Sequence, residues 1–312
     1  MVSRLVNVLA VVLLIPLSCS LLPSAGAAGA ELVMWKCDNG TYYAPNTTYQ
    51  SNVRSLLASL AANASDSSFP VGFATAVLGA SPDMVWGLGI CRGDTYDADC
   101  GSSLALAPEV AFGRCQGVKD VTVFYDRCTL RYSFGDFLTN PDNRQVQDTG
   151  TSGDNVTSNA GWFDALVVSL IGQLSDWAAF NATSRYAVGV MNSDQGFPAT
   201  DKGVVHKIMG LVQCTPDQSP GDCRQCLRAL IDEMPTVFNG TVGGRIFTVW
   251  CYLRFEVHEF YDGSPMLNLA ATQFMPPPPP APTDHQIGIL FQGFQKILTY
   301  AFKETLTILK NY

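Results

Sequence analysis

The sequence contains the same cysteine spacing twice, in Cys91-Arg-Gly-Asp-Thr-Tyr-Asp-Ala-Asp-Cys100 and in Cys214-Thr-Pro-Asp-Gln-Ser-Pro-Gly-Asp-Cys223. Adding 123 to a position in the first half gives its counterpart in the second: Cys128 falls on Cys251, and Leu130-Arg131-Tyr132 falls on Leu253-Arg254-Phe255. A constant offset over this span indicates an internal duplication. The two copies differ, because Ser103 stands opposite Cys226, Phe238 stands opposite Cys115, and the second copy has no counterpart of Cys37.

The first 30 residues are typical of a secretory signal peptide. Arg4 precedes an apolar run over residues 8–17, and two small-residue cleavage sites, at residues 25–27 and 28–30, follow it. Cleavage would remove Cys19 and leave nine of the ten cysteines, an odd number, so at least one thiol lacks a partner within the chain. Six sequons agree with export and predict glycosylation, at Asn39, Asn46, Asn63, Asn155, Asn181 and Asn239.

The charge of the chain excludes one class of partner. Its formal net charge is -8, with only 15% charged residues, and it has no basic block. A phosphate backbone would be repelled, so we expect no nucleic-acid partner.

Each copy has the same coarse pattern of elements. Apolar residues at helical spacing (Val53, Leu56, Leu57 and Leu60; Phe163, Leu166, Val167 and Leu170) precede a short strand at residues 73–77 or 186–190. The cysteine motif then opens a second helix, which in the second copy ends near Pro235, and strand-like runs follow at residues 121–132 and 245–257. Without regular βαβ alternation, this pattern predicts an α+β fold: two tandem small domains, each with two helices packed on an antiparallel sheet.

The predicted domain boundaries follow composition. A signal peptide (1–30) precedes the first domain (31–138), a polar linker (139–160) and the second domain (161–262). A proline-rich spacer (263–285) precedes a tail (286–312) in which Ile287, Leu290, Phe294 and Ile297 recur at helical spacing. Charges interrupt the tail, and its longest uncharged run is far shorter than the roughly 20 residues that a membrane span needs. It is suited to contact with a membrane surface or a partner, and a tail without a role is the alternative.

These motifs resemble a known family. The pattern Cys214-x8-Cys223-x2-Cys226, with Gly244-Arg245 and Cys251-Tyr-Leu-Arg-Phe-Glu256, resembles the plant stress-antifungal (ginkbilobin-homologous) domain. In the first copy, Cys91-Arg92-Gly93-Asp94 and Tyr125-Asp126-Arg127-Cys128 look like the same signature. Two copies after a signal peptide resemble a cysteine-rich repeat secretory protein, or the ectodomain of a cysteine-rich receptor-like kinase.

The resemblance implies a disulfide scheme. The family's domain pairs its first cysteine with the fifth, the second with the third and the fourth with the sixth. Carried over, this gives Cys37–Cys115, Cys91–Cys100, Cys214–Cys223 and Cys226–Cys251. Because Ser103 replaces the fourth cysteine of the first copy, Cys128 would be a free thiol, either buried and inert or available for an intermolecular bridge.

The resemblance also implies a sugar site. In the family's antifungal seed protein, mannose is held by an Asn, an Arg and a Glu, whose positions correspond here to Asp38, Thr122 and Ser133 in the first copy, so the first copy has lost the set. The second copy retains Arg245 and Glu256, which we take as the candidate ligand-binding pair. A solvated sheet face is the competing interpretation, and along a straight strand the two side chains would lie roughly 36 Å apart on opposite faces, so a shared site needs a bend near Cys251.

The sequence contains no recognisable catalytic or metal motif. Its three histidines, His206, His258 and His285, show no metal-binding spacing, and there is no phosphate loop or nucleophile elbow. Cys223-Arg-Gln-Cys226 has the form of a redox motif but lacks the surrounding pattern. We therefore predict no enzyme activity, no cofactor and no metal.

Three functions remain open for a protein of the apoplast. The first is a module in stress or defence that recognises another extracellular protein or ectodomain. The second is an antifungal protein that binds a mannose-type glycan through the second domain. The third is a degenerate structural duplicate without a ligand. Fold alone does not decide among them.

Overall fold

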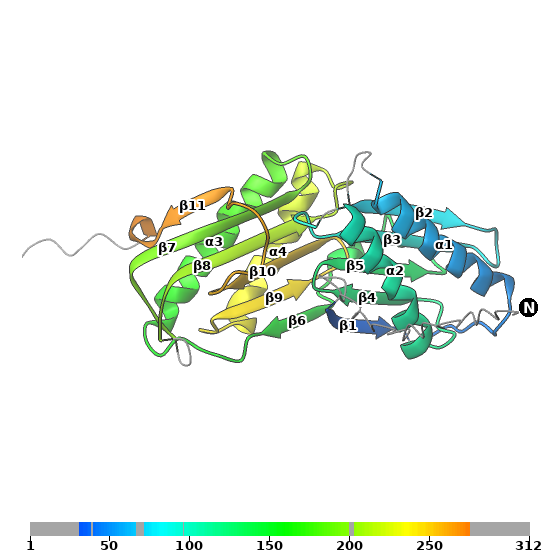
Figure 1. Ribbon diagram of the computed structural model, residues 1–312, viewed down its shortest axis with the longest axis horizontal. Coiled ribbons are helices and arrows are strands. Elements are labelled where there is room, and N and C mark those ends of the chain that lie inside the picture. The colour runs from blue at the N-terminus through cyan, green and yellow to red at the C-terminus, as the bar shows by residue number, and fades with distance from the viewer. Residues whose placement is uncertain (1–30, 39, 67–71, 96, 200–202, 275–312) are drawn as a thin grey trace, which may run out of the picture. The chain divides into compact units, whose positions relative to one another are not determined.

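The computed structural model describes residues 31–38, 40–66, 72–95, 97–199 and 203–274. Two antiparallel sheets, each covered on one face by two helices, lie in one compact unit that ends at Leu269 (Figure 1). The predicted α+β fold with two tandem domains is thus confirmed. The predicted signal peptide and tail, and residues 275–285 of the predicted proline-rich spacer, lie outside the described residues.

The first sheet has the strand order β1-β4-β5-β3-β2. Its elements are β1 (Leu32–Cys37), α1 (Thr48–Ala64), β2 (Phe73–Leu78), β3 (Val85–Cys91), α2 (Asp97–Arg114), β4 (Val121–Tyr125) and β5 (Cys128–Ser133). The helix α1 begins where the hydroxyl of Thr47 accepts a hydrogen bond from the backbone N–H of Gln50. Its buried face, which includes Val53, Leu56 and Leu60, packs on β2 and β3.

The second sheet repeats this order and adds one strand, as β6-β9-β10-β8-β7-β11. Its elements are β6 (Asp148–Thr151), α3 (Ala160–Phe180), β7 (Tyr186–Ala199), β8 (Gly203–Cys214), α4 (Pro220–Val237), β9 (Gly243–Phe247), β10 (Cys251–Glu256) and β11 (Leu267–Ala270), with short 3-10 helices η1 (Pro141–Arg144) and η2 (Ala271–Phe274). The helix α4 begins at Ser219, whose hydroxyl accepts from the N–H of Asp222, and Pro220 occupies its first turn.

The apolar helix α3 is long and apolar enough to cross a membrane by length and composition, although half of its most apolar stretch is buried. Its buried residues, including Phe163, Leu166 and Leu170, face β7 and β8. A row of buried apolar residues along one face is typical of a helix that packs on the sheet of an α+β domain.

The structure differs from the sequence predictions in four places. The predicted proline-rich spacer (263–285) contains β11 and η2 in its first half. Residues 139–160, predicted as a linker, contain η1 and β6, and β6 pairs with β9 as an edge strand of the second sheet. The strand β7 is much longer than residues 186–190 and forms a hairpin with β8. The helix α4 continues past Pro235 to Val237, because a proline in the last turn removes only one of the final hydrogen bonds.

Candidate functional site

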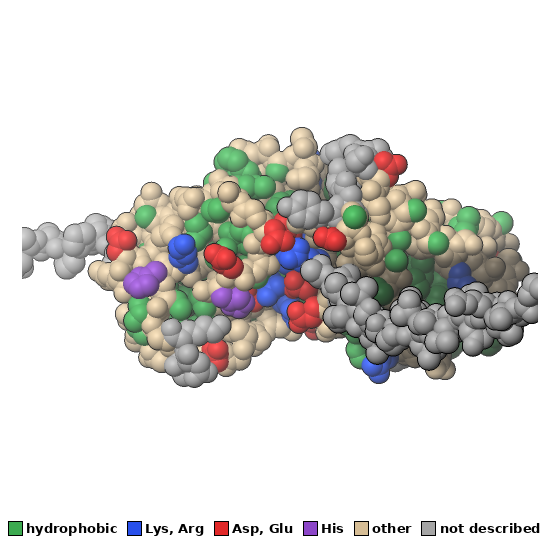
Figure 2. All heavy atoms as spheres, in the orientation of Figure 1, with side chains coloured by type: hydrophobic (Ala, Val, Ile, Leu, Met, Phe, Trp, Pro, Cys, Tyr) green, Lys and Arg blue, Asp and Glu red, His purple; other side chains and the backbone are tan. Residues whose placement is uncertain are grey.

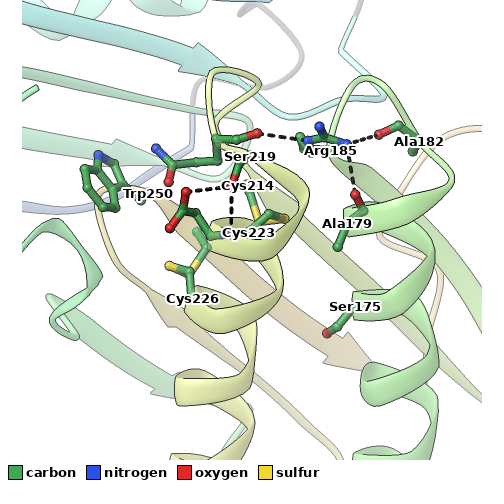
Figure 3. The surroundings of a disulfide bond; sticks show 12 residues. Ser175, Ala179, Ala182, Arg185, Cys214, Ser219, Cys223, Cys226 and Trp250 are labelled. Carbon is green, nitrogen blue, oxygen red and sulfur yellow. Dashed lines mark hydrogen bonds between the residues drawn. A yellow bond between two sulfur atoms is a disulfide. The ribbon is translucent and has the colours of Figure 1, made fainter. Parts of the chain in front are cut away.

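Four disulfides staple the two halves internally. They are Cys37–Cys115, Cys91–Cys100, Cys214–Cys223 and Cys226–Cys251, with Cα–Cα distances of 5.5, 5.7, 5.6 and 6.2 Å. These are the pairs that the family resemblance implied. Figure 3 shows Arg185 beside the Cys214–Cys223 bridge, where its guanidinium donates to the carbonyls of Ala179 and Ala182 at the end of α3. The bridges thus join strand ends to helices within each half.

Cys128 is free and buried. It pairs with Cys91 in the β3–β5 register, and Cys91 is bonded to Cys100, one helical turn before Ser103 on α2. The hydroxyl of Ser103 is fully buried, and among the described residues it has no hydrogen-bond partner. Burial raises the pKa of the Cys128 thiol to about 12, so the thiol is protonated at neutral pH.

The candidate sugar ligands, Arg245 and Glu256, lie on neighbouring strands. Residues 248–250 reverse the chain between β9 and β10, and this places Arg245 opposite Arg254 and Glu256 opposite Gly243. Arg245, Arg254 and Glu256 therefore share one face of the sheet. The Glu256 carboxylate accepts from Nε of Arg254 at 3.0 Å, whereas Arg245 lies against Gly150 of β6. The bend that a shared site needs is present, but Glu256 is engaged by Arg254.

Glu256 belongs to a larger group of charges, the central charged cluster, which consists of Arg92, Asp94, Asp126, Arg254 and Glu256. The carboxylate of Asp126 bridges Arg92 at 3.1 Å and Arg254 at 2.5 Å, and Arg92 also binds Asp94 at 2.6 Å. The Arg92 and Asp94 side chains are only 2% and 3% exposed. Figure 2 shows acidic and basic side chains gathered near the middle of this view. Because Arg92, Asp94 and Asp126 come from the first half and Arg254 and Glu256 from the second, the cluster joins the two halves.

In the central charged cluster, the effect of burial on the pKa of each arginine is opposed by the charges of its neighbours. Burial alone would lower the pKa of Arg92, but the hydrogen bond and charge of Asp94, together with the charge of Asp126, raise it overall. Burial would also lower the pKa of Arg254, but the charges of Tyr252, Asp126 and Glu256 raise it overall. Both guanidinium groups therefore remain charged and paired.

Further contacts surround the cluster. The buried amide of Gln213 donates to the carbonyl of Cys91 at 3.0 Å and accepts from the N–H of Gly93 at 3.2 Å, so one side chain of the second half binds the backbone of the first. A Cβ at Gly93 would overlap the ring of Tyr186, so only glycine allows this approach. The rings of Phe124 and Phe247 pack with centroids 5.2 Å apart.

A polar cavity of about 220 Å³ lies against the first sheet. It is lined by Lys36, Asp38, Asp120, Thr122, Arg131, Phe137, Asn140, Asn143, Gln145 and Gln147. Asp120 accepts from Arg131 at 3.0 Å and from Ser133 at 2.9 Å. Two of the three first-copy sugar positions, Asp38 and Thr122, therefore line this cavity, and the third, Ser133, is hydrogen-bonded to its wall.

In the part of the chain that the structure describes, no three His, Cys, Asp or Glu side chains are grouped so that they could hold a metal ion. His206 binds the carbonyl of Ser193 within the β7–β8 hairpin, and His258 lies 3.9 Å from Glu256.

The fold and these contacts define a tandem, disulfide-stapled α+β module whose two halves are joined by buried ion pairs. The salt stress response/antifungal family matches the chain twice, over residues 36–135 and 148–258, and the chain belongs to this family.

Similar proteins are named as receptor-like kinases. The chain is 41% identical over 236 residues to cysteine-rich receptor-like protein kinase 6 of Oryza sativa subsp. japonica, covering 75% of this chain and 33% of that protein. It is 33% identical to putative cysteine-rich receptor-like protein kinase 9 of Arabidopsis thaliana, over 72% of this chain and 81% of the relative. The chain spans about a third of the length of several of these relatives.

Two solved structures share the fold. The tandem DUF26 ectodomain of the Arabidopsis thaliana cysteine-rich receptor-like protein PDLP8 matches 73% of this chain and 98% of its own, with a TM-score of 0.60 and 22% identity. That of PDLP5 matches 73% and 100%, with a TM-score of 0.56 and 20% identity. The similarity to these ectodomains and to the receptor-like kinases supports an extracellular receptor-like module.

Sequence reasoning missed the central charged cluster as a site. Its residues were visible, because Arg92, Asp94 and Asp126 stand in the first-copy motifs and Arg254 and Glu256 in the second-copy motif. The offset of 123 could not show that Asp126 would bind Arg254, because it matches equivalent positions of the two copies and carries no information on contacts between the copies.

Proposed function

We propose that the chain is a secreted, non-enzymatic recognition module of the apoplast that binds another extracellular protein, in the manner of a soluble receptor ectodomain acting in stress or defence. The observation that supports this most is the central charged cluster. It joins two domains through side chains that are buried and paired, so the two halves are held together and can offer their outer surfaces to one partner. A standard protein–protein interface takes about 800 Å² from each partner, and two joined domains provide more surface for it than one small domain does.

The same cluster weakens the competing hypothesis of a mannose site in the second copy. A carboxylate that grips a sugar hydroxyl must offer a free oxygen to accept a hydrogen bond. One oxygen of Glu256 accepts from Arg254, which is held in turn by Asp126 of the first half, and the Glu256 side chain is only 10% exposed, so little of the carboxylate is open to a sugar. Releasing Glu256 for a sugar would leave Arg254 with one charged partner fewer in a site that is largely buried.

The test is a binding comparison on the purified, glycosylated mature chain. It is presented to a panel of tandem ectodomains from cysteine-rich receptor-like proteins and, separately, to a glycan array that includes mannan. We expect saturable binding to at least one ectodomain, and we expect Arg245→Ala to leave that affinity unchanged. Selective mannan binding that Arg245→Ala or Glu256→Ala abolishes would contradict this proposal, and binding to neither panel would favour the degenerate duplicate.

A second candidate function rests on the polar cavity of the first sheet. The Nε of Arg131 is buried there without a hydrogen-bond partner among the described residues, and Lys36 and Asp38 add further donors and acceptors. A buried guanidinium N–H that lacks an acceptor favours a polar ligand such as a sugar. Titration calorimetry with mannose and short mannans tests it: Asp38→Ala should abolish any binding, whereas Asp232→Ala, at an exposed ion pair on α4, should not.

A further inference from the structure

The outer edge of β2 is left open where the equivalent edge of the second sheet is covered. The pairing of β2 with β3 matches that of β7 with β8, so Thr75 corresponds to Val188 and Val77 to Val190. In the second sheet β11 lies beyond β7, and the N–H of Met266 donates to the carbonyl of Val188 at 2.8 Å. Among the described residues, no strand lies beyond β2, which ends the first sheet.

The exposure of the two strands reflects this difference. Val190 and Met191 are 6% and 0% exposed, whereas their counterparts Val77 and Leu78 are 49% and 37% exposed. The strand Phe73–Leu78 contains no charged residue, no proline and no irregularity in its pairing. Proteins usually protect a free edge with charged residues, prolines or bulges, so an edge that has none of these is suited to pairing with another strand.

The correspondence between β2 and β7 shows which backbone groups of β2 face the open edge. In an antiparallel sheet the N–H and C=O of one residue point to the same side, and the side alternates along the strand. Because the carbonyl of Val188 points toward β11, the backbone groups of Thr75 and Val77 point away from β3. The side chains of Ala74 and Ala76 pack into the core under α1, so those of Thr75 and Val77 lie on the opposite face.

We propose that β2 pairs antiparallel with β2 of a second copy of this chain, about a two-fold axis at Ala76. This axis places Thr75 of each copy opposite Val77 of the other, and these are the residues whose backbone groups face the open edge. The two first sheets then join into one continuous sheet. Because β2 carries no charge, two copies of it can pair without bringing like charges together.

The helix α1 leaves room for this pairing. Its one exposed cation, Arg54, stacks over the ring of Phe112 on α2, at 4.5 Å from the centroid. The other exposed side chains along its middle are small: Ser51, Ser55, Ala58, Ser59 and Ala62. Asn63, in the last turn, is also exposed, and a glycan on its sequon is the one large group that two α1 helices side by side would have to accommodate.

The test is sedimentation equilibrium of the full mature chain over a wide range of concentration. We expect a reversible monomer–dimer equilibrium. Val77→Lys, which puts a charge on the edge, should weaken it by roughly tenfold or more, since each dimer contains the change twice. Thr75→Pro should do the same, because it removes an N–H that points away from β3. The matched control is Val204→Lys, at a residue 55% exposed on β8, which should leave the equilibrium unchanged.

Three outcomes would overturn the proposal. The first is a chain that stays monomeric both with its glycans and after enzymatic deglycosylation; the deglycosylated sample is included because a glycan at Asn63 would lie near β2. The second is a dimer that Val77→Lys leaves intact, and the third is a covalent dimer on non-reducing electrophoresis. Unchanged melting temperatures of the variants would show that the edge, and not the fold, was altered. The measurement uses the chain alone, so it is independent of whether another ectodomain binds.

Discussion

At the scale of single residues, the first half lacks one of the two cysteines that form the Cys226–Cys251 bridge in the second half. Ser103 occupies on α2 the position that Cys226 occupies on α4, and Cys128 occupies the position of Cys251. Both are buried, and neither the Ser103 hydroxyl nor the Cys128 thiol is bridged. A buried thiol behaves as a small apolar side chain, so its reactivity depends on whether the thiolate can form.

We predict that Cys128 is inert in the folded protein. With a pKa of about 12, only about one thiol in 10⁴ is ionised at pH 8. Iodoacetamide should therefore leave the native chain unmodified and label one cysteine after unfolding in guanidinium without reductant, as read by mass spectrometry. Rapid labelling of the native chain at pH 8 would show that Cys128 is accessible.

Restoring the missing cysteine should restore the bridge. Ser103→Cys is expected to form a disulfide with Cys128 across 25 residues, the separation that Cys226 and Cys251 have in the second half. Closing a loop of this length stabilises a protein by about 3 kcal/mol. Denaturant unfolding and a thiol count would measure both effects. The control is Ser102→Cys, an exposed neighbour on α2 that points away from the core and should leave two free thiols and unchanged stability.

At the scale of elements, the sequence predicts the long helices and the strands that carry apolar residues, because their periodicity reflects a buried face. It does not predict β6, whose residues Asp148–Thr151 contain no apolar side chain, or β11, which has only four residues. Both are edge strands that form by pairing their backbones with a strand already in place. Such elements depend on tertiary contacts more than on local pattern, and for this reason the polar composition of residues 139–160 predicts a linker where β6 forms.

We predict that the stability of the fold depends on the protonation of Asp164, which lies on α3. Burial raises the pKa of its carboxyl above the usual range, and the N–H of Gly240, which donates to it at 3.0 Å, offsets part of this rise. An acid whose pKa is raised by folding contributes stability below its unfolded pKa of about 3.9 and loses it as the pH rises through the folded value.

Asp164→Asn removes this titration and keeps an oxygen that can accept from Gly240. Its melting temperature relative to the parent chain should therefore increase between pH 3 and pH 7. The control is Asp232→Asn, at an exposed carboxylate paired with Arg228, for which the difference should not increase with pH. A difference for Asp164→Asn that stays constant or falls over this range would contradict the assignment.

At the scale of the whole molecule, the central charged cluster determines how the halves are held. Asp126→Asn removes the charge that both Arg92 and Arg254 share, which leaves two largely buried cations with weaker partners. We expect a loss of roughly 2–4 kcal/mol in the free energy of unfolding. Arg228→Gln, which breaks an exposed pair on α4, should cost less than about 0.5 kcal/mol. Equal effects of the two substitutions would show that the cluster is not buried in solution.

The cluster also makes a prediction about cooperativity. Each half has its own sheet, helices and disulfides, so each can melt separately unless contacts between them cost more to break than the difference in their stabilities. Those contacts are the ion pairs of Asp126, the Gln213 amide on the backbone of Cys91 and Gly93, and the Phe124–Phe247 rings. Calorimetry of the intact chain should therefore show one transition, and the double variant Asp126→Asn with Gln213→Ala should show two. Because the two side chains support the same interface, their combined effect should differ from the sum of the single effects. Two transitions in the unmodified chain would mean that the halves are only tethered, and a single binding surface across both domains could then no longer be assumed.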